Sequence, residues 1–237
     1  MKRLFIIPIF ILLYSFLCFS QANEKITFNI KLFLQGPYNN NVMSNELSKE
    51  NLTPLYQPYN RKPWDYNGKE HVIKIPENIV DWVLVELTND TNRSKLIAEK
   101  AAFITSNGMI TSLDGRSPLT FENINVKKCY LIIYHRNHLP IMSGEPVTIR
   151  SSVNYDFTID KEKAFGNSSI DLGNGVFGMI SGDSDSNGEI NNQDFKVVAA
   201  NLLKIGYINA DLDMNGVVNV LDYKKTNINL SKKTAFR

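Results

Sequence analysis

Two near-identical acidic loops, placed 28 residues apart near the C-terminus, constrain this chain more than any other feature. Residues 183–194 and 211–222 each carry oxygen-bearing side chains at loop positions 1, 3, 5, 9 and 12, and a glycine at position 6. A calcium ion takes oxygen ligands from a tight loop with this spacing, and the glycine allows the sharp turn. The pattern therefore predicts two Ca2+ ions in a small duplicated unit.

The candidate ligands occupy equivalent positions in the two loops. In the first loop they are Asp183, Asp185, Asn187, Glu189, Asn191 and Asp194. In the second loop they are Asp211, Asp213, Asn215, Val217, Asn219 and Asp222. Position 7 would contribute a backbone carbonyl, so its side chain is free to vary, and position 12 is Asp where the EF-hand pattern has Glu. Two surface turns rich in Asp, Asn and Gly are the alternative, but agreement at six positions in both loops favours calcium.

The local charge supports a cation. Residues 181–222 carry seven acidic and two basic side chains, a net charge of −5, which two divalent ions would bring to −1. The apolar residues at position 8, Ile190 and Val218, suit a short strand bridge between the paired loops.

Each loop is followed by a helical pattern, through Leu203 after the first loop and more weakly to Leu230 after the second. The chain thus contains a loop followed by a helix twice, with Asp at loop position 12. This arrangement resembles the type I dockerin module. The resemblance implies two calcium ions, two roughly antiparallel helices and a cohesin-like partner. Dockerins often hold Ser-Thr at positions 10 and 11, where they contact cohesin. Here these positions are Asn192-Gln193 and Val220-Leu221, and we expect the apolar pair to pack against a neighbouring domain.

The N-terminus predicts export. Lys2 and Arg3 precede an apolar run from Leu4 to Phe19, which is typical of a secretory signal peptide and short for a membrane anchor. We expect a secreted or cell-surface protein with no membrane span after cleavage. The exported chain would have 24 basic and 24 acidic residues, which gives no reason to expect a nucleic-acid partner. Cys129 would be the one remaining cysteine. It lies in an apolar run, and we expect it to be a buried, unreactive side chain.

The middle of the chain reads as all-β. Alternating or apolar runs predict strands at 26–34, 82–87, 102–105, 119–121, 130–134 and 147–149, with a hairpin turn at Ser106–Met109. The predicted fold is mainly β with a small α module: an Ig-like β-sandwich followed by two calcium loop–helix (F-hand) motifs. The expected divisions are a signal peptide (1–20), the sandwich (24–160), a linker (161–177), the dockerin-like module (178–230) and a tail (231–237).

A second resemblance covers nearly the whole exported chain. Segments including Phe33–Tyr38, Gln57–Asn60, Asp81–Leu87 and His135–Leu139 resemble, in order, a β-domain-plus-dockerin-like unit found in secreted Bacteroidetes-type surface proteins. This resemblance implies a surface or secreted location and brings no known enzymatic activity or ligand.

Other candidate chemistry is sparse. His135 and His138, with Arg136, could form a metal site or a hydrogen-bonded structural element. Asp81 and Glu86 flank a strand without a visible partner carboxylate, so glycosidase chemistry is unsupported. An aromatic cluster in the irregular segment 39–69 could stack on sugar rings or cover an edge of the sandwich: Tyr56, Tyr59, Trp64 and Tyr66.

We therefore expect a non-catalytic secreted or surface protein, in which the calcium module stabilises or assembles the β-sandwich for adhesion or assembly. The alternative is a cohesin-binding or carbohydrate-binding accessory in extracellular polysaccharide degradation.

Overall fold

The computed structural model describes residues 25–236, and the signal peptide predicted at 1–20 lies outside them. The strands are β1 (Lys25–Lys31), β2 (Tyr38–Asn39), β3 (Val42–Met43), β4 (Ile79–Thr88), β5 (Leu96–Thr105), β6 (Met109–Thr111), β7 (Leu119–Glu122), β8 (Lys128–His135), β9 (His138–Met142), β10 (Val147–Thr148), β11 (Ser152–Asp156), β12 (Ile170–Gly173) and β13 (Val176–Gly178). The helices are α1 (Glu46–Lys49), α2 (Asn192–Asn201) and α3 (Val220–Ile228), and 3-10 turns lie at Lys161–Lys163 and Phe165–Asn167.

A nine-stranded sheet dominates the molecule, in the order β10-β8-β4-β5-β6-β1-β11. β7 also pairs with β1, and β9 also pairs with β8, so the sheet branches at two strands. All pairings are antiparallel except that of β1 with β11. The expectation of a mainly β protein is confirmed, and the large branched sheet is consistent with a sandwich.

The predicted strands are present, and several further strands were not predicted. The hairpin at Ser106–Met109 joins β5 to β6, with Ile104 opposite Ile110. β11 is a further strand of the expected sandwich region, whereas the β12–β13 hairpin lies almost wholly where a linker was expected. Glycines at 173 and 175, with positive φ, form the turn of that hairpin, and Phe177 donates a backbone hydrogen bond to Thr158. Segment 161–177 is therefore ordered and paired.

The central strand β4 is buried on both faces along its whole length. Val83, Val85 and Leu87 enter the larger core, whereas Trp82 and Leu84 enter a second apolar cluster on the opposite face, as strand alternation requires. The irregular segment before β4 covers this second face with the buried rings of Tyr59 and Tyr66. These two aromatics therefore pack on the sheet, while Tyr56 remains exposed.

Cys129 lies fully buried in the larger core, as expected, and burial raises the pKa of its thiol to about 12. A thiol with such a pKa carries little thiolate at neutral pH, so Cys129 is not an activated nucleophile.

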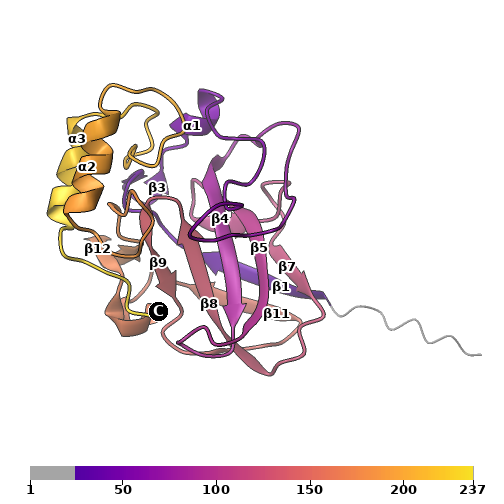
Figure 1. The fold of residues 1–237 in the computed structure, drawn as a ribbon. Helices are drawn as coiled ribbons and strands as arrows, with labels where there is room; N and C mark the ends of the chain where they lie inside the picture. The colour runs from indigo at the N-terminus through magenta and orange to yellow at the C-terminus, as the bar shows by residue number, and fades with distance from the viewer. Residues whose placement is uncertain (1–24, 237) are drawn as a thin grey trace, which may run out of the picture.

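The two longer helices lie side by side against one flank of the β part, and the chain after α3 returns to the β part below them (Figure 1). Phe195 of α2 and Tyr223 of α3, which occupy equivalent positions in the two repeats, contact each other with ring centroids 4.8 Å apart. No helix within residues 25–236 has the length and apolar character needed to cross a membrane.

Candidate metal centres

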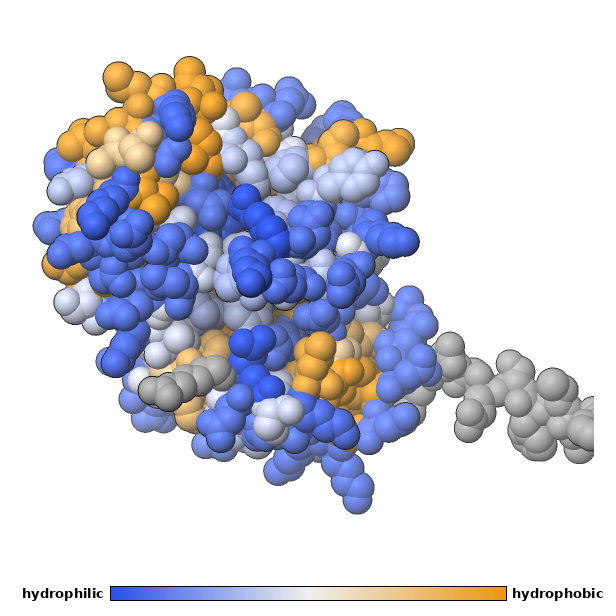
Figure 2. Space-filling model, in the orientation of Figure 1, coloured by the Kyte–Doolittle hydropathy of each residue, from blue (hydrophilic) through white to orange (hydrophobic). Residues whose placement is uncertain are grey.

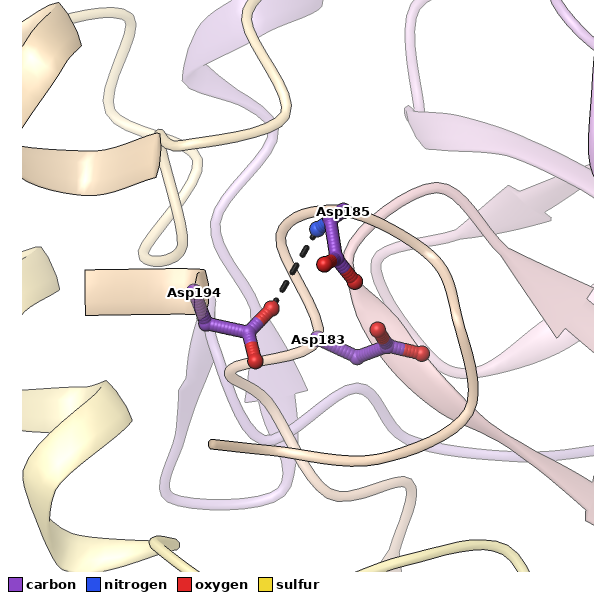
Figure 3. A group of neighbouring side chains, drawn as sticks. All are labelled: Asp183, Asp185 and Asp194. Carbon is purple, nitrogen blue, oxygen red and sulfur yellow. Dashed lines mark hydrogen bonds between the residues drawn. The ribbon is translucent and has the colours of Figure 1, made fainter. Parts of the chain in front are cut away.

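Three carboxylates converge in each acidic loop. Asp183, Asp185 and Asp194 each offer an oxygen within 4.8 Å of the others, and Asp211, Asp213 and Asp222 do the same in the second loop. Figure 3 shows the first group, with the carboxylates of Asp183 and Asp185 in the loop facing that of Asp194 at the start of α2. Positions 1, 3 and 12 of the predicted pattern are thus brought together in both loops.

The backbone of each loop wraps around its position-1 carboxylate. Asp183 accepts hydrogen bonds from the N–H groups of Asn187 (2.9 Å) and Gly188 (3.0 Å). Asp211 accepts the equivalent bonds from Asn215 (3.1 Å) and Gly216 (2.9 Å). Gly188 and Gly216 have φ of +86° and +88°, a region that favours glycine.

The position-12 carboxylate joins each loop to its helix. In the first repeat Asp194 accepts backbone N–H bonds from Ser184 (2.7 Å) and Asn191 (2.9 Å). In the second repeat Asp222 accepts the equivalent bonds from Leu212 (2.7 Å) and Asn219 (2.8 Å). These bonds complete a capping box at the start of α2 and of α3. The loop and helix of each repeat are therefore held as one unit.

The asparagines predicted as ligands have roles in the loop backbone. At position 9, the side-chain oxygens of Asn191 and Asn219 cap the helices by accepting from Gln193 and Leu221. At position 5, Asn187 and Asn215 accept from the backbone N–H groups of Glu189 and Val217. The Glu189 side chain is exposed, in line with a position that would offer only its carbonyl.

Both acidic loops contain buried carboxylates that form no salt bridge with a described residue. Asp194, Asp211 and Asp222 are fully buried and Asp183 is 1% exposed, yet no Lys, Arg or His within residues 25–236 forms a salt bridge with them. Burial and the neighbouring aspartates raise the pKa of Asp183 to about 8 and that of Asp213 to about 7. Burying several negative charges together is costly unless a cation compensates them. An all-oxygen donor set of this kind fits calcium.

The duplication extends beyond the predicted module. After α2, Leu203 and Lys204 exchange backbone hydrogen bonds with Val218 of the second loop. After α3, the equivalent Ser231 and Lys232 exchange them with Ile190 of the first loop. The expected bridge between the two loops is therefore wrong, because each loop pairs with the segment that leaves the other repeat's helix. Residues 231–234, expected as a tail, belong to this pairing.

A buried turn of the β part attaches both loops to the sheet. Asn137, between β8 and β9, donates from Nδ2 to the carbonyls of Asn209 (3.1 Å) and Asp211 (2.8 Å). Its own carbonyl accepts from Gly182, just before the first loop. Arg136 beside it donates to the carbonyl of Ile208, and its own carbonyl accepts from Ser186 of the first loop at 2.7 Å.

Arg136 is itself fully buried and paired. Its Nε donates to Asp81 at 2.9 Å, and its guanidinium lies 4.2 Å from the ring centroid of Tyr207. Tyr207 also donates to Asp81, at 2.6 Å. The sequence predicted a polar site at 135–138 but not that this turn holds the acidic loops against the sheet. A run of polar residues between two apolar strands was the feature that could have indicated it.

The histidine pair has no nitrogen free for a metal. His138 Nε2 accepts from the Gly36 N–H at 3.0 Å, which leaves its Nδ1–H to donate toward Asn137 and His135, at 2.8 and 3.0 Å. His135 Nε2 in turn donates to Asp81 at 3.2 Å. Both rings are buried within this network, so the structural interpretation of the pair holds.

The apolar pair Val220-Leu221 does not pack against the β part, and that expectation is wrong. The two side chains are 61% and 50% exposed. Figure 2 shows apolar surface over the helical part of the molecule. The exposed large apolar residues of this helical face are Leu202, Leu203, Ile205, Val220, Leu221, Tyr223, Ile228 and Leu230. We call this set the helical apolar face.

Comparison with known proteins gives limited information. No protein-family model matches the chain, and no curated protein matches it significantly. Two solved structures are similar, both described as interface mutants of a type II cohesin–X–dockerin complex from Acetivibrio cellulolyticus. The N-terminal interface mutant has TM-score 0.43 and 11% identity, over 89% of this chain and 96% of that one. The C-terminal interface mutant has TM-score 0.45 and 12% identity, over 89% and 97%. Scores this low do not establish a shared fold.

Proposed function

We propose that residues 178–234 form a dockerin-like module that binds two Ca2+ ions, one in each loop. The supporting observation is that three carboxylates converge in each loop and form no salt bridge with a described residue. The bound ion would neutralise the carboxylates and tie positions 1 and 3 of the loop to position 12 of the following helix.

Calcium titration of the exported chain, followed by calorimetry, tests this proposal. The unaltered protein should bind two ions, Asp183→Ala and Asp211→Ala should each bind one, and the double variant should bind none. Asp65→Asn is the matched control, because Asp65 is exposed, its side chain makes no hydrogen bond to a described residue, and asparagine tolerates its φ of +49°. Two ions bound by the double variant, or none by the unaltered chain, would remove the calcium assignment.

We further propose that the protein is non-catalytic and acts by binding a protein partner through the helical apolar face. Eight large apolar side chains are exposed there, on a surface formed by both repeats. An exposed apolar patch of this kind marks a protein interaction site. Dockerins contact cohesin through loop positions 10 and 11, which are Asn192-Gln193 and Val220-Leu221 here. The second pair belongs to the helical apolar face, so the partner we propose is a cohesin-like β-sandwich protein.

The candidate catalytic carboxylates have structural partners, which supports a non-catalytic role. Asp81 is fully buried in the network of Arg136, His135 and Tyr207. Glu86 accepts two hydrogen bonds from Arg93, at 3.0 and 2.8 Å.

A calcium-dependent binding assay with a purified cohesin tests the partner. Val220→Lys and Leu203→Asn should each weaken binding roughly tenfold or more, because each removes a large exposed apolar side chain from the face. Asparagine tolerates the positive φ of position 203, which limits folding damage. The matched control is Ile73→Lys, since Ile73 is 97% exposed and lies outside the helices. An equal loss in the control, or no cohesin binding with calcium present, would contradict the proposal.

A further inference from the structure

A cleft separates the second face of the sheet from the first acidic loop. Its volume is about 210 Å³, and segments far apart in the sequence contribute to it: the irregular segment, β4, β5, β8, β9, the first loop and the C-terminus. None of the residues of the helical apolar face lines it. A ligand bound in the cleft would therefore not touch the surface proposed to bind the protein partner.

One wall of the cleft is aromatic and fixed in place. Trp64 lines the cleft and is half-buried, with its ring edge-to-face against Tyr59 at a centroid distance of 4.9 Å. Tyr59 is fully buried, and its hydroxyl donates a hydrogen bond to the Trp82 carbonyl at 2.8 Å. The ring that Trp64 packs against is therefore fixed to the sheet. Phe236 and Leu84 add further apolar surface.

The polar groups of the cleft combine acceptors and donors. Glu86 and Glu99 lie directly opposite each other on β4 and β5, and only Arg93, beside them, carries the opposite charge. Arg93 binds Glu86, whereas no described residue donates a hydrogen bond to the Glu99 carboxylate. Opposed like charges in a strand pair are unfavourable unless a further group donates to them. Burial and Glu86 raise the pKa of Glu99 accordingly.

Donors and acceptors also lie on the opposite wall. Asn187 of the first loop and Thr234 at the C-terminus both line the cleft. The buried Oγ1 of Thr234 has no hydrogen-bond partner among the described residues. Carboxylates, a guanidinium and a hydroxyl beside an aromatic ring match a ligand whose groups both donate and accept while its faces are apolar.

We propose that this cleft binds one unit of a neutral saccharide, with the sugar ring against Trp64 and its hydroxyls shared between Glu99, Arg93 and Thr234. Sugar hydroxyls can donate to the unpartnered carboxylate and accept from the guanidinium, and C–H faces suit the indole. The excess of acidic over basic side chains in the cleft selects against acidic sugars.

Binding to neutral gluco-, xylo- and manno-oligosaccharides, measured by calorimetry with calcium present, tests the site. Trp64→Ala should weaken binding roughly tenfold or more, because the stacking surface is lost. Tyr56→Ala is the matched control: Tyr56 is 67% exposed on the same segment and does not line the cleft. Glu99→Gln keeps the shape of the side chain and, since Glu99 has no partner, should preserve folding while weakening binding several-fold.

Fluorescence gives an independent readout in the unaltered chain. Of its two tryptophans, Trp82 is fully buried and only Trp64 lines the cleft, so a saccharide-induced change in emission reports on Trp64. Absence of binding to every saccharide, or an equal loss in Tyr56→Ala, would overturn the proposal. Binding of lysine or arginine amide in place of sugars would also overturn it, by showing that the acidic pair selects cations. Leu203→Asn, which tests partner docking, should leave saccharide binding unchanged.

Discussion

At the scale of single residues, Arg136 connects the sheet to the loops. It pairs with Asp81 in a fully buried site, stacks on Tyr207 and donates to the carbonyl of Ile208, just before the second loop. Burial opposes ionisation of Asp81, but the charge of Arg136 and hydrogen bonds from His135 and Tyr207 outweigh it and lower the pKa of Asp81 to about 2. The pair is therefore fully ionised at neutral pH.

Removing Arg136 should destabilise the whole chain. Arg136→Ala leaves the Asp81 carboxylate buried without its countercharge, and we expect the free energy of unfolding in urea to fall by about 3–5 kcal/mol. Arg150→Ala, at an exposed arginine, is the control and should change it by less than about 0.5 kcal/mol. Similar values for the two variants would show that Arg136 does not hold the parts together.

The buried histidines should make stability depend on pH. Burial lowers the pKa of His135 and of His138 below the ordinary value, so the unfolded chain takes up protons below about pH 6.5 that the folded chain does not. Their contribution to stability is complete above that pH and is lost as the pH falls toward their folded-state pKa values. Urea unfolding in calcium should show stability decreasing from pH 7 to pH 5. In His138→Gln this decrease should be shallower by up to about 1.4 kcal/mol per pH unit. An unchanged slope would exclude His138 as the source.

At the scale of elements, each repeat is a loop, a helix and an exit strand that pairs with the other loop. Equivalent residues of the repeats share unusual backbone angles: Leu203 and Ser231 have φ of 66° and 69°, and Ser186 and Met214 both have 62°. Neither repeat completes its own pairing, because the partner of each position-8 residue belongs to the other repeat. The two loops should therefore form and melt together.

Calcium binding should compete with protons. Because burial and neighbouring aspartates raise the pKa of Asp183 to about 8 and of Asp213 to about 7, the metal-free loops hold protons at neutral pH that calcium must displace. The apparent calcium affinity should fall as the pH is lowered from 8 to 6. Calorimetry in buffers of different ionisation enthalpy should detect the released protons. A heat of binding independent of the buffer would contradict the raised pKa values.

At the scale of the whole molecule, the C-terminal residues join the helical part to the sheet. After its pairing with the first loop, the chain places Phe236 in the second apolar cluster, which also contains Trp82 and Tyr134. The β12–β13 hairpin fills the segment expected to be a linker. The sheet and the helical part therefore share buried surfaces along their boundary and should unfold as one unit.

Phe236→Ala should weaken the packing of the C-terminal residues on the sheet. The loss of this buried phenylalanine should lower the free energy of unfolding by about 3 kcal/mol, the lower end of the range for core aromatics. Ala235→Ser, at the exposed neighbouring position, should have little effect. In the unaltered protein with calcium, limited proteolysis should not cut cleanly within 161–177, and one melting transition should be observed. Two transitions would show that the parts fold separately.

The sequence alone determined the acidic loops, the helices after them and most of the strands of the sheet. These features depend on the spacing of residues close together in the chain, where loop geometry and side-chain alternation act directly. The placement of Val220-Leu221 on the surface, the pairing of 231–234 with the first loop and the order in 161–177 depended on the tertiary structure. So did the meeting of Asp81, Arg136 and Tyr207, because these residues come from distant segments and their contacts exist only once the sheet and the loops are packed together.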